Sequence, residues 1–384
     1  MFKLKTILFT AAASMSVSTG LTQLVDGHAY MQGDYVEVAI SERGREGAPA
    51  LEDDDIYHFY GDLPIWGFIS NPAMDDWATT NGDFFAPGTP ECGFGLTYTL
   101  LGETVSYGNN YNIFEIPGEI TDYTETPDSV MVTWEGMIDS LQVIQLFTLK
   151  KDEHFYRTEV TLNNLGSETF TDVYFYDSVD PDNNQQAGGG FATDNTIISQ
   201  SEMADDSAIV LAEQTSPWLS QVFLKAYGPE WKVGTGGFSN RNGEEIWTGT
   251  GAIYGTEGYN SFTDQAICIA RKTESIAPGK AGTSFSYVTA FIANTTVDEP
   301  VNDASINELQ KAVRLFPNPT IDQTFTIQLE GTFSYVVSDI AGKVIQTGTA
   351  DNNTLVDLGD VEKGVYLIKL SQNGQSTVRK LQLN

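Results

Sequence analysis

The sequence predicts an all-β protein with a large β-sandwich followed by a small β-sandwich at the C-terminus. Strand-like runs with period-two alternation recur along the chain, Gly and Asn/Asp clusters separate them, and no long stretch has helical periodicity. The Gly and Asn/Asp clusters are typical of the turns that connect strands, because chain reversals favour these residues. We expect a signal segment at 1–20, the large sandwich at 30–295, a linker at 296–311 and the small sandwich at 312–384.

The large sandwich is expected to use strands throughout its length. In chain order, these are predicted over residues 33–40, 129–134, 140–148, 154–163, 171–176, 218–227 and 284–292. In the first strand, alternation sets Tyr35 opposite Val36, Val38 and Ile40. One domain of about 260 residues is near the upper end for a single all-β domain, so two smaller sandwiches are the alternative. A short helix is expected over 304–311.

The small sandwich shows strands and turns of the same kind. Residues 324–329 alternate, which predicts Phe325, Ile327 and Leu329 on one face. Residues 364–370 form a second, more continuous strand. The Ala-Gly pair at 341–342 and the Asn-Gly pair at 373–374 predict hairpin turns, because Gly tolerates the positive φ that such turns need.

Residues 1–20 have the order of a secretory signal peptide. Lys3 and Lys5 give a basic start, residues 7–17 are apolar or small, and small residues come next, with Ala29 as the latest cleavage choice. This run is too short for a transmembrane helix, which needs about 20 apolar residues. A buried helix is the alternative, although it would be expected to carry a polar face. We expect export to the periplasm and no transmembrane segment in the mature chain.

The chain is strongly acidic, with 52 Asp and Glu against 20 Lys and Arg and a formal net charge of −32. Residues 312–384 hold six basic and seven acidic residues, so the acidity belongs to the large sandwich. Such a surface repels phosphate backbones, which argues against a nucleic-acid partner. Solubility is one explanation of the charge. Calcium binding is the other, because hard cations prefer carboxylate and carbonyl oxygens.

Short sequence blocks occur in a fixed order near the C-terminus: AVRLFPNPT at 312–320, VVSDIAGKV at 336–344, KGVYLIKL at 363–370 and RKLQLN at 379–384. They resemble the type A sorting domain of the type IX secretion system of Bacteroidota, an Ig-like β-sandwich. The resemblance implies that the secretion machinery is a partner and that the chain travels through the periplasm to the outer-membrane surface or beyond. It places the sorting motif at Pro317, Asn318, Pro319, Gly342, Gly364 and Tyr366.

Two departures from that family pattern concern the fate of the protein after export. Residues 321–323 stand where a Gly commonly follows the Pro-Asn-Pro element, and the chain ends at Asn384 where members often end in a basic residue. They leave open whether the product is anchored or released.

The remaining chain then corresponds to cargo. Residues 30–38 and 82–91 resemble openings of large secreted surface proteins of Bacteroidota, and this implies an extracellular location. Residues 155–183 are weakly similar to strands of supersandwich domains that occur beside carbohydrate-active modules. This second resemblance carries no catalytic residue onto the sequence.

Cys92 and Cys268 are the two cysteines of the chain. An oxidising compartment would allow them to form a disulfide, which stabilises by several kcal/mol on the loop-entropy model. Two buried free thiols are the alternative, because free Cys is among the most buried residue types. None of the three His is in a metal-binding spacing with these Cys residues, which argues against zinc.

Asp180, Asp182 and Asn184 alternate directly after the strand-like residues 173–176. This spacing resembles the opening of a calcium loop, whose side-chain oxygens surround one ion. The Gly and the bidentate Glu that an EF-hand needs are missing, so the pattern predicts at most an irregular calcium site. A turn without an ion is the alternative.

Aromatic residues give a further indication of a ligand. Tryptophans near Gly- and Asp-rich turns are candidates for glycan contact: Trp66, Trp77, Trp218, Trp231 and Trp247. Sugar CH groups stack on such rings while nearby polar groups bind the hydroxyls. Core packing is the alternative for each of them.

Motifs of catalysis are missing from the sequence, including the Gly-x-Ser-x-Gly elbow, the phosphate loop and the His-Glu-x-x-His helix. His58 and His154 stand near aromatic residues and are expected to be structural. The preferred function is a non-catalytic surface or released protein that binds polysaccharide or extracellular matrix, or acts in adhesion. A carbohydrate-active enzyme is the first alternative, because a glycosidase needs only two suitably spaced carboxylates. A structural surface-layer component is the second.

Overall fold

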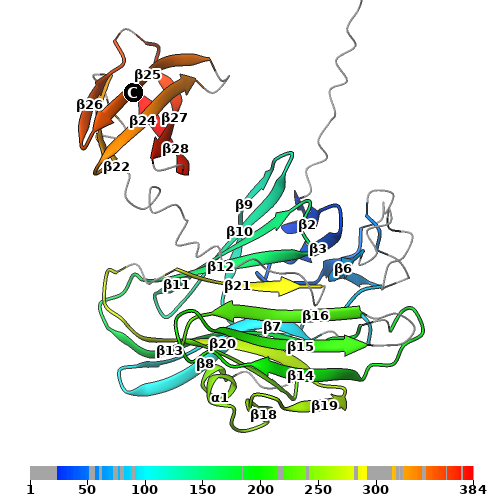
Figure 1. Ribbon diagram of the computed structural model, residues 1–384. Helices are drawn as coiled ribbons and strands as arrows, with labels where there is room; N and C mark the ends of the chain where they lie inside the picture. The colour runs from blue at the N-terminus through cyan, green and yellow to red at the C-terminus, as the bar shows by residue number, and fades with distance from the viewer. Residues whose placement is uncertain are drawn as a thin grey trace, which may run out of the picture. The chain divides into compact units, whose positions relative to one another are not determined.

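The computed structural model describes residues 24–51, 57–59, 63–71, 77, 82–88, 91–183, 185–214, 220–238, 242–280, 284–291, 314–316, 320, 323–339, 343–359, 361–372 and 375–383. The chain divides into two compact units, Met1–Ala293 and Asn294–Asn384, and each has its own apolar core (Figure 1). The predicted all-β class is confirmed, since nearly all described elements are strands. The expected signal segment and the expected helix over 304–311 lie outside the described residues.

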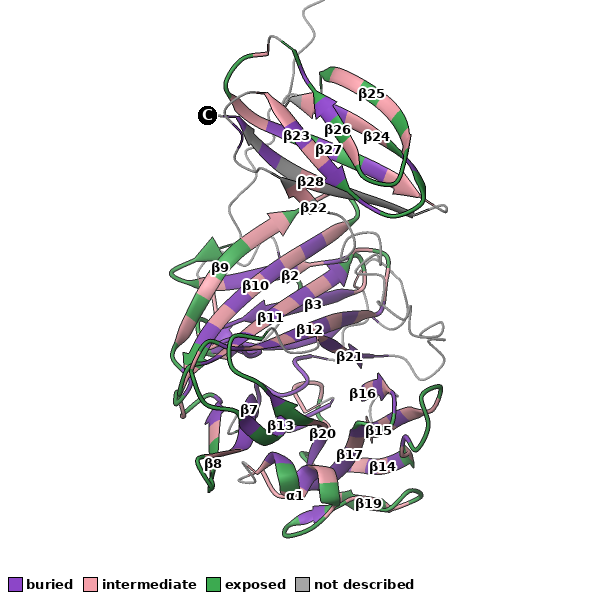
Figure 2. Ribbon diagram, turned by 90° about the vertical axis from the view of Figure 1, so that its left-hand side faces the viewer, coloured by how far each residue is buried: buried purple, intermediate pink, exposed green. Residues whose placement is uncertain are grey.

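A long antiparallel sheet, here called the major sheet, forms one layer of the first unit. In spatial order its strands are β19 (Asn260–Thr263), β14 (Thr193–Ser199), β15 (Ser207–Gln214), β16 (Ser220–Tyr227), β21 (Phe285–Ala290), β12 (Phe155–Asn164), β11 (Leu141–Lys150), β10 (Ser129–Ile138) and β9 (Gly118–Glu125). Buried residues alternate with less buried ones along β10, β11, β12 and β15 (Figure 2). Successive side chains point to opposite faces of a strand, so one face of this sheet forms the core.

A second sheet packs against that buried face. Its strands, in spatial order, are β18 (Ile253–Tyr254), β17 (Trp231–Gly236), β20 (Ala266–Ile276), β13 (Phe170–Val179), β7 (Cys92–Leu100) and β8 (Glu103–Asn109). The ring of Phe175 on β13 lies 5.5 Å from that of Phe285 and 6.0 Å from that of Tyr287, both on β21. Residues of both sheets share one apolar cluster, so the first unit is a single sandwich, as predicted.

The outer face of the second sheet carries α1 (Gly243–Thr248), the helix of the part of the chain that the structure describes. The Asn242 side chain accepts hydrogen bonds from the amides of Glu244 and Glu245, and Gly249 ends the helix in the left-handed conformation that Gly adopts easily. Ile246 packs with Tyr176 and other residues of the sheet. Sequence periodicity did not predict this helix because six residues are too few to show a helical period.

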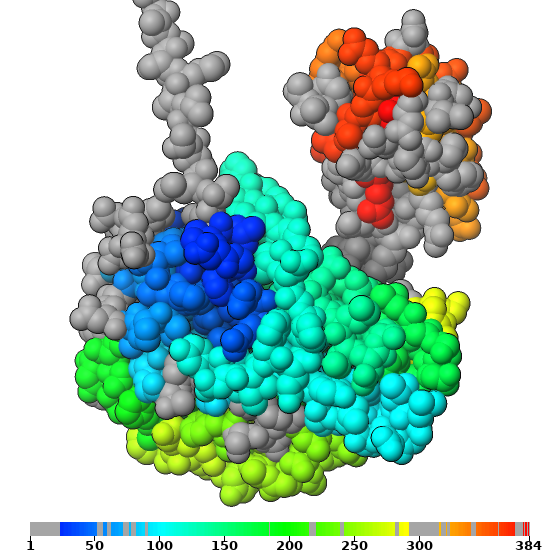
Figure 3. All heavy atoms as spheres, turned by 180° about the vertical axis from the view of Figure 1, so that it is seen from behind, coloured from blue at the N-terminus to red at the C-terminus, as the bar shows by residue number. Residues whose placement is uncertain are grey.

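Near its N-terminus the first unit has a smaller sheet, here called the N-terminal sheet. It contains β1 (Leu24–Val25), β2 (His28–Gln32), β3 (Val36–Ile40) and β6 (Phe68–Ser70), and β4 (Ala48–Pro49) pairs with β5 (Ile65–Trp66) nearby. Val38 joins the main core, while Tyr30 and Ala39 join a separate cluster on the other face. These N-terminal residues, in blue, form a continuous area of the surface in Figure 3.

The second unit also has two layers. One sheet contains β22 (Arg314–Phe316), β23 (Thr324–Gln328) and β26 (Thr354–Asp357), and the other contains β25 (Val344–Asp351), β24 (Thr332–Asp339), β27 (Gly364–Gln372) and β28 (Gln375–Leu383). The predicted inward face is confirmed, because Phe325, Ile327 and Leu329 are all buried. Consecutive strands β24 and β25, and likewise β27 and β28, pair antiparallel as the predicted hairpins require.

Most strands expected in the first unit are present, with ends that differ by a few residues. The strand expected over 33–40 is one of these, and it begins at Val36. The amide of Gly33 donates to the carbonyl of Val36 at 2.9 Å, so the residues before Val36 form a turn. Tyr35 therefore belongs to a turn beside the sheet and does not oppose Val36 across a strand.

Candidate functional site

A cavity of about 510 Å³ opens beside the N-terminal sheet. Its lining combines two aromatic rings with charged and amide side chains: Gln32, Gly33, Asp34, Tyr35, His58, Asn71, Trp77 and Lys151. These residues come from the turn between β2 and β3, from the end of β6, from the residue after β11 and from segments between strands. Residues distant in sequence thus meet at one site.

His58 and Trp77 form the aromatic side of this cavity. Their rings are stacked, with centroids 4.5 Å apart and planes 2° apart. Trp77 has a φ of +62°, a region that costs a non-Gly residue on the order of 1–2 kcal/mol. Backbone strain of this kind concentrates at functional sites. The His58 ring fixes the plane of the Trp77 indole.

A buried carboxylate orients His58. One oxygen of Glu37 accepts from Nδ1 of His58 at 2.8 Å and from the Gln32 amide at 2.9 Å, and the other accepts from the His58 backbone amide at 2.8 Å. Burial raises the pKa of Glu37, and its hydrogen bonds to His58 and Gln32 act in the opposite direction. Because an ionised carboxylate only accepts hydrogen bonds, Nδ1 of His58 carries the hydrogen in this pair.

Tyr35 supplies the second ring of the cavity. It stacks on His154 with centroids 4.4 Å apart and planes 8° apart. The backbone amide of Asn71 donates to the Tyr35 carbonyl at 2.8 Å, and that of Asp34 donates to the Lys151 carbonyl at 2.6 Å. The rings and the backbone around the cavity are therefore fixed by local contacts. Burial lowers the pKa of His154.

Two of the three predicted calcium ligands, Asp180 and Asp182, lie close to a further carboxylate. One carboxylate oxygen each from Asp180, Asp182 and Asp264 lie within 4.8 Å of one another. Asp180 and Asp182 are buried, and Asp264 is exposed. Asn184, the third predicted ligand, lies outside the described residues. Asp264 was not predicted from the sequence.

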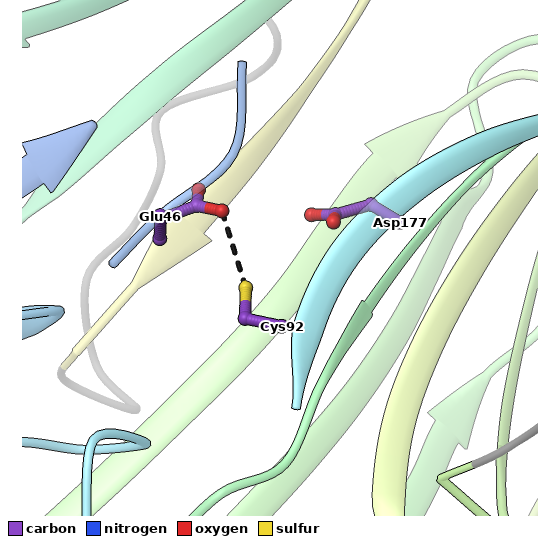
Figure 4. Close-up of side chains that lie close together, drawn as sticks. All are labelled: Glu46, Cys92 and Asp177. Atoms are coloured by element: carbon purple, nitrogen blue, oxygen red, sulfur yellow. Dashed lines mark hydrogen bonds between the residues drawn. The ribbon is translucent and has the colours of Figure 1, made fainter. Parts of the chain in front are cut away.

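A second acidic cluster lies in the core of the first unit. Side chains of Glu46, Cys92 and Asp177 point toward one another from three separate segments (Figure 4). The Cys92 thiol donates to Glu46 at 3.2 Å, and the Tyr156 hydroxyl donates to the other Glu46 oxygen at 2.7 Å. Burial raises the pKa of the Cys92 thiol, with further contributions from Glu46 and Asp177. A thiol of this kind is chemically inert.

Of the two possibilities that the sequence leaves open for the cysteines, the structure has two buried free thiols and no Cys92–Cys268 disulfide. Cys92 on β7 pairs with Val179 of β13, whereas Cys268 on β20 pairs with Ser178 of β13. The whole of β13 thus separates the cysteines, at twice the strand spacing of about 4.8 Å. Disulfides require Cα atoms within about 7 Å. The two thiols also point to opposite faces, because Ser178 and Val179 are adjacent.

The tryptophan predictions are corrected in two cases. Trp66 and Trp231 are 5% and 2% exposed and belong to apolar clusters, so they offer no face to a ligand. Trp247 lies on α1, where its Nε1 donates to the Glu230 carbonyl at 2.8 Å, away from the cavity lining. Trp218 lies outside the described residues. Of the five candidates, Trp77 lines the cavity.

Sorting-motif residues fall partly within the described second unit. Pro317, Asn318, Pro319 and Gly342 lie outside the described residues. Gly364 begins β27, and Tyr366 is buried with its hydroxyl donating to the Glu362 carbonyl at 2.7 Å. The family model described as "secretion system C-terminal sorting domain" matches residues 314–384. These residues are a type IX secretion sorting domain.

The sorting domain identifies the chain as a protein exported to the cell surface or the extracellular space. None of its described helices is long and apolar enough to cross a membrane. A search of curated protein sequences finds no match.

Solved structures similar to the chain include carbohydrate-active enzymes. A polysaccharide lyase is 12% identical over 77% of this chain and 40% of its own, with a TM-score of 0.31. A mutant of the heparan sulfate lyase HepC of Pedobacter heparinus is 7% identical over 91% of this chain and 40% of its own, with a TM-score of 0.30. A putative aldose 1-epimerase of Escherichia coli is 10% identical over 69% of this chain and 99% of its own, with a TM-score of 0.34. The chain spans about 40% of the length of the two lyases.

Several site residues were not found from the sequence. The sequence predicts a strand position for Tyr35 and a structural role for His58, and it links neither of them to Lys151, which lies about a hundred residues later in the chain. Asp264 is a lone acidic residue between two strands. The pairing of β13 with β20 is the signal that would have found it, and sequence periodicity does not specify pairing.

Proposed function

We propose that the sorting domain exports a non-catalytic saccharide-binding protein, and that the cavity beside the N-terminal sheet is its binding site. The observation that carries this proposal is the combination of Tyr35 and Trp77 with Gln32, Asn71 and Asp34 around one cavity. Sugar CH groups pack on aromatic faces, and amide and carboxylate groups exchange hydrogen bonds with hydroxyls. The volume of about 510 Å³ lies within the range of small-molecule sites.

Preorganisation supports this proposal. Trp77 is stacked on His58, and Tyr35 is stacked on His154. Rings held in place before binding lose little conformational entropy when a ligand arrives, so more of the contact energy appears as affinity.

The charges of the site favour an uncharged glycan. Lys151 is the cation of the lining, and its Nζ forms an ion pair with Glu125 at 2.5 Å. Asp34 adds a negative charge to the lining, and the chain as a whole carries −32. Sulfated or uronate-rich polymers would be repelled over this surface.

A pull-down of the full chain against neutral and acidic polysaccharides tests the proposal. We expect retention on neutral polymers, loss of retention for Trp77→Ala and Tyr35→Ala, and no loss for Tyr254→Ala. Tyr254 is a suitable control because it is 49% exposed and stacks on Tyr259, with centroids 4.4 Å apart, outside the cavity lining. Retention that is independent of Trp77 and Tyr35 would refute this binding site.

The His58–Glu37 pair favours one second candidate, a carbohydrate-active enzyme. A carboxylate that fixes the tautomer of a cavity-lining His is the arrangement of a general base and its orienting group. Glu46 and Asp177 are less suitable, because both are fully buried and a glycosidase pair must flank its substrate. Oligosaccharide in the pull-down supernatant, lost in His58→Ala while polymer retention persists, would establish the enzyme. Binding without product would support the non-catalytic protein.

A further inference from the structure

The acidic cluster of Asp180, Asp182 and Asp264 joins two connections that are distant in sequence. Asp180 and Asp182 come after β13, and Asp264 lies between β19 and β20. The last described pair of the β13–β20 ladder is Val179 with Ile267. Continuing the antiparallel register by three residues sets Asp182 opposite Asp264. The ladder itself therefore brings these carboxylates together.

Buried oxygens in this cluster have no hydrogen-bond donor. Oδ1 of Asp180 and Oδ1 of Asp182 are both inaccessible to solvent and without a hydrogen-bond partner. The two residues are 6% and 1% exposed. The neighbouring Asn183 is fully buried, and its Oδ1 is also without a partner, although its Nδ2 donates to the Ala212 carbonyl at 2.9 Å. Buried polar atoms in folded proteins normally have partners, so these oxygens lack a hydrogen-bond donor or a cation.

The charged groups around Asp180 and Asp182 do not supply a cation. The charged groups that act on Asp180 are the carboxylates of Asp264 and Glu91. Those that act on Asp182 are the carboxylates of Asp180, Asp264 and Asp83. Each of these neighbours is acidic. Buried charges are otherwise paired or coordinate a metal.

We propose that Asp180, Asp182 and Asp264 bind a calcium ion. The donor atoms are all oxygens, which hard cations prefer over the nitrogen and sulfur ligands that zinc and copper favour. Calcium takes six to eight oxygen ligands in flexible geometry, so water on the side of the exposed Asp264 completes the coordination. The site is independent of the saccharide cavity, with which it shares no residue.

Hydrogen bonds show what the ion stabilises. The amide of Asp180 donates to the Glu91 carbonyl at 2.9 Å, and the amide of Asp182 donates to the Phe84 carbonyl at 2.5 Å. The Asp83 amide in turn donates to the Gln186 side chain at 2.7 Å. Calcium bound here holds the segment before β7, the β13–β14 connection and the β19–β20 connection together.

Thermal unfolding of the full chain, stripped with EDTA and then titrated with CaCl2, tests this proposal. At a calcium concentration about 100 times the Kd, we expect the Tm to rise by roughly 5–10 °C. Asp182→Asn and Asp264→Asn should lose this rise, while Asp205→Asn should keep it. Asp205 is a matched control because it is an exposed Asp in the connection between β14 and β15.

Calorimetric titration with CaCl2 provides the second measurement. We expect the wild type and Asp205→Asn to bind one calcium ion per chain more than Asp264→Asn. In EDTA, Asp182→Asn should unfold at or above the wild-type Tm, because the amide removes a buried carboxylate from an acidic cluster. Asp264 is exposed, so its variant tests the site without threatening the fold. A wild-type Tm that CaCl2 does not change, or equal responses in all variants, would overturn the proposal.

Discussion

Asp177 is a buried acid whose protonation is coupled to folding. Burial and the Glu46 carboxylate raise its pKa well above the usual value, while the Tyr287 and Ser178 hydrogen bonds act in the opposite direction. In the unfolded state Asp177 has a pKa of about 4 and loses its proton above that pH, whereas the folded state retains the proton. The stabilisation is complete below that pH and is lost as the pH rises toward the folded-state pKa.

The free energy of unfolding should accordingly decrease with pH where Asp177 contributes. Between its unfolded and folded pKa values, one such group contributes a decrease of about 1.4 kcal/mol per pH unit. We expect Asp177→Asn, which carries no charge at any pH, to show a shallower decrease than the wild type between pH 5 and pH 8. Denaturant unfolding at both values, in the same CaCl2 buffer, measures the difference. Parallel pH dependences in the two proteins would disprove the role of Asp177.

The indole of Trp134, a residue of β10, lies in close contact with the backbones of β9 and β10. Gly118 and Gly136 are register partners across these strands, and a Cβ on either would collide with the Trp134 ring. Trp134 is fully buried, and its Nε1 donates to the Glu42 carbonyl at 2.9 Å. The absence of a Cβ at both glycines leaves the space that the Trp134 ring occupies.

Gly136→Ala should therefore destabilise the first unit by about 1–3 kcal/mol through overpacking. Neither its φ nor that of Gly237 is in the left-handed region, so the comparison isolates sterics. Gly237→Ala is the control, because its nearest neighbour, Cβ of Ala252, is 4.0 Å away. Denaturant midpoints of the three proteins provide the test, and equal midpoints would show that Trp134 moves aside at no cost.

The alternation of apolar and polar residues is the feature of the sequence that predicts most of the strands. Phe325, Ile327 and Leu329 were placed on one buried face because period two is a local property that packing preserves. The same holds for β10, β11 and β12, whose burial alternates along their length. The prediction over residues 33–40 was wrong for the first three residues, because the Gly33–Val36 turn precedes the strand.

Sites depend on which strands become neighbours, and this is not local. The position of β13 between β7 and β20 rules out the disulfide and brings Asp264 to Asp182. The cavity joins Tyr35 and Trp77 through segments that sequence periodicity does not relate. Trp66 and Trp231 were candidates on the same grounds as Trp77, since residue type and flanking turns do not distinguish buried rings from accessible ones.

In the whole molecule, the sorting domain directs export, and the binding function that we propose belongs to the first unit. Deleting residues 312–384 should leave the protein in the periplasm, because the secretion system recognises this domain. Cell fractionation of the native host, with a periplasmic marker and the full-length protein as controls, measures the distribution. Surface delivery of the truncated chain equal to that of the full chain would contradict the sorting role.

Saccharide binding by the exported chain, through its N-terminal cavity, can be measured by titration calorimetry. The full chain, Trp77→Ala and Trp247→Ala would each be titrated with soluble oligosaccharide of the polymer that retains the protein. We predict that Trp77→Ala weakens binding by about tenfold or more, since truncation of an aromatic hot spot costs at least about 1.4 kcal/mol, and that Trp247→Ala binds as the wild type does. Equal affinities for Trp77→Ala and the wild type would show that the cavity is not the binding site.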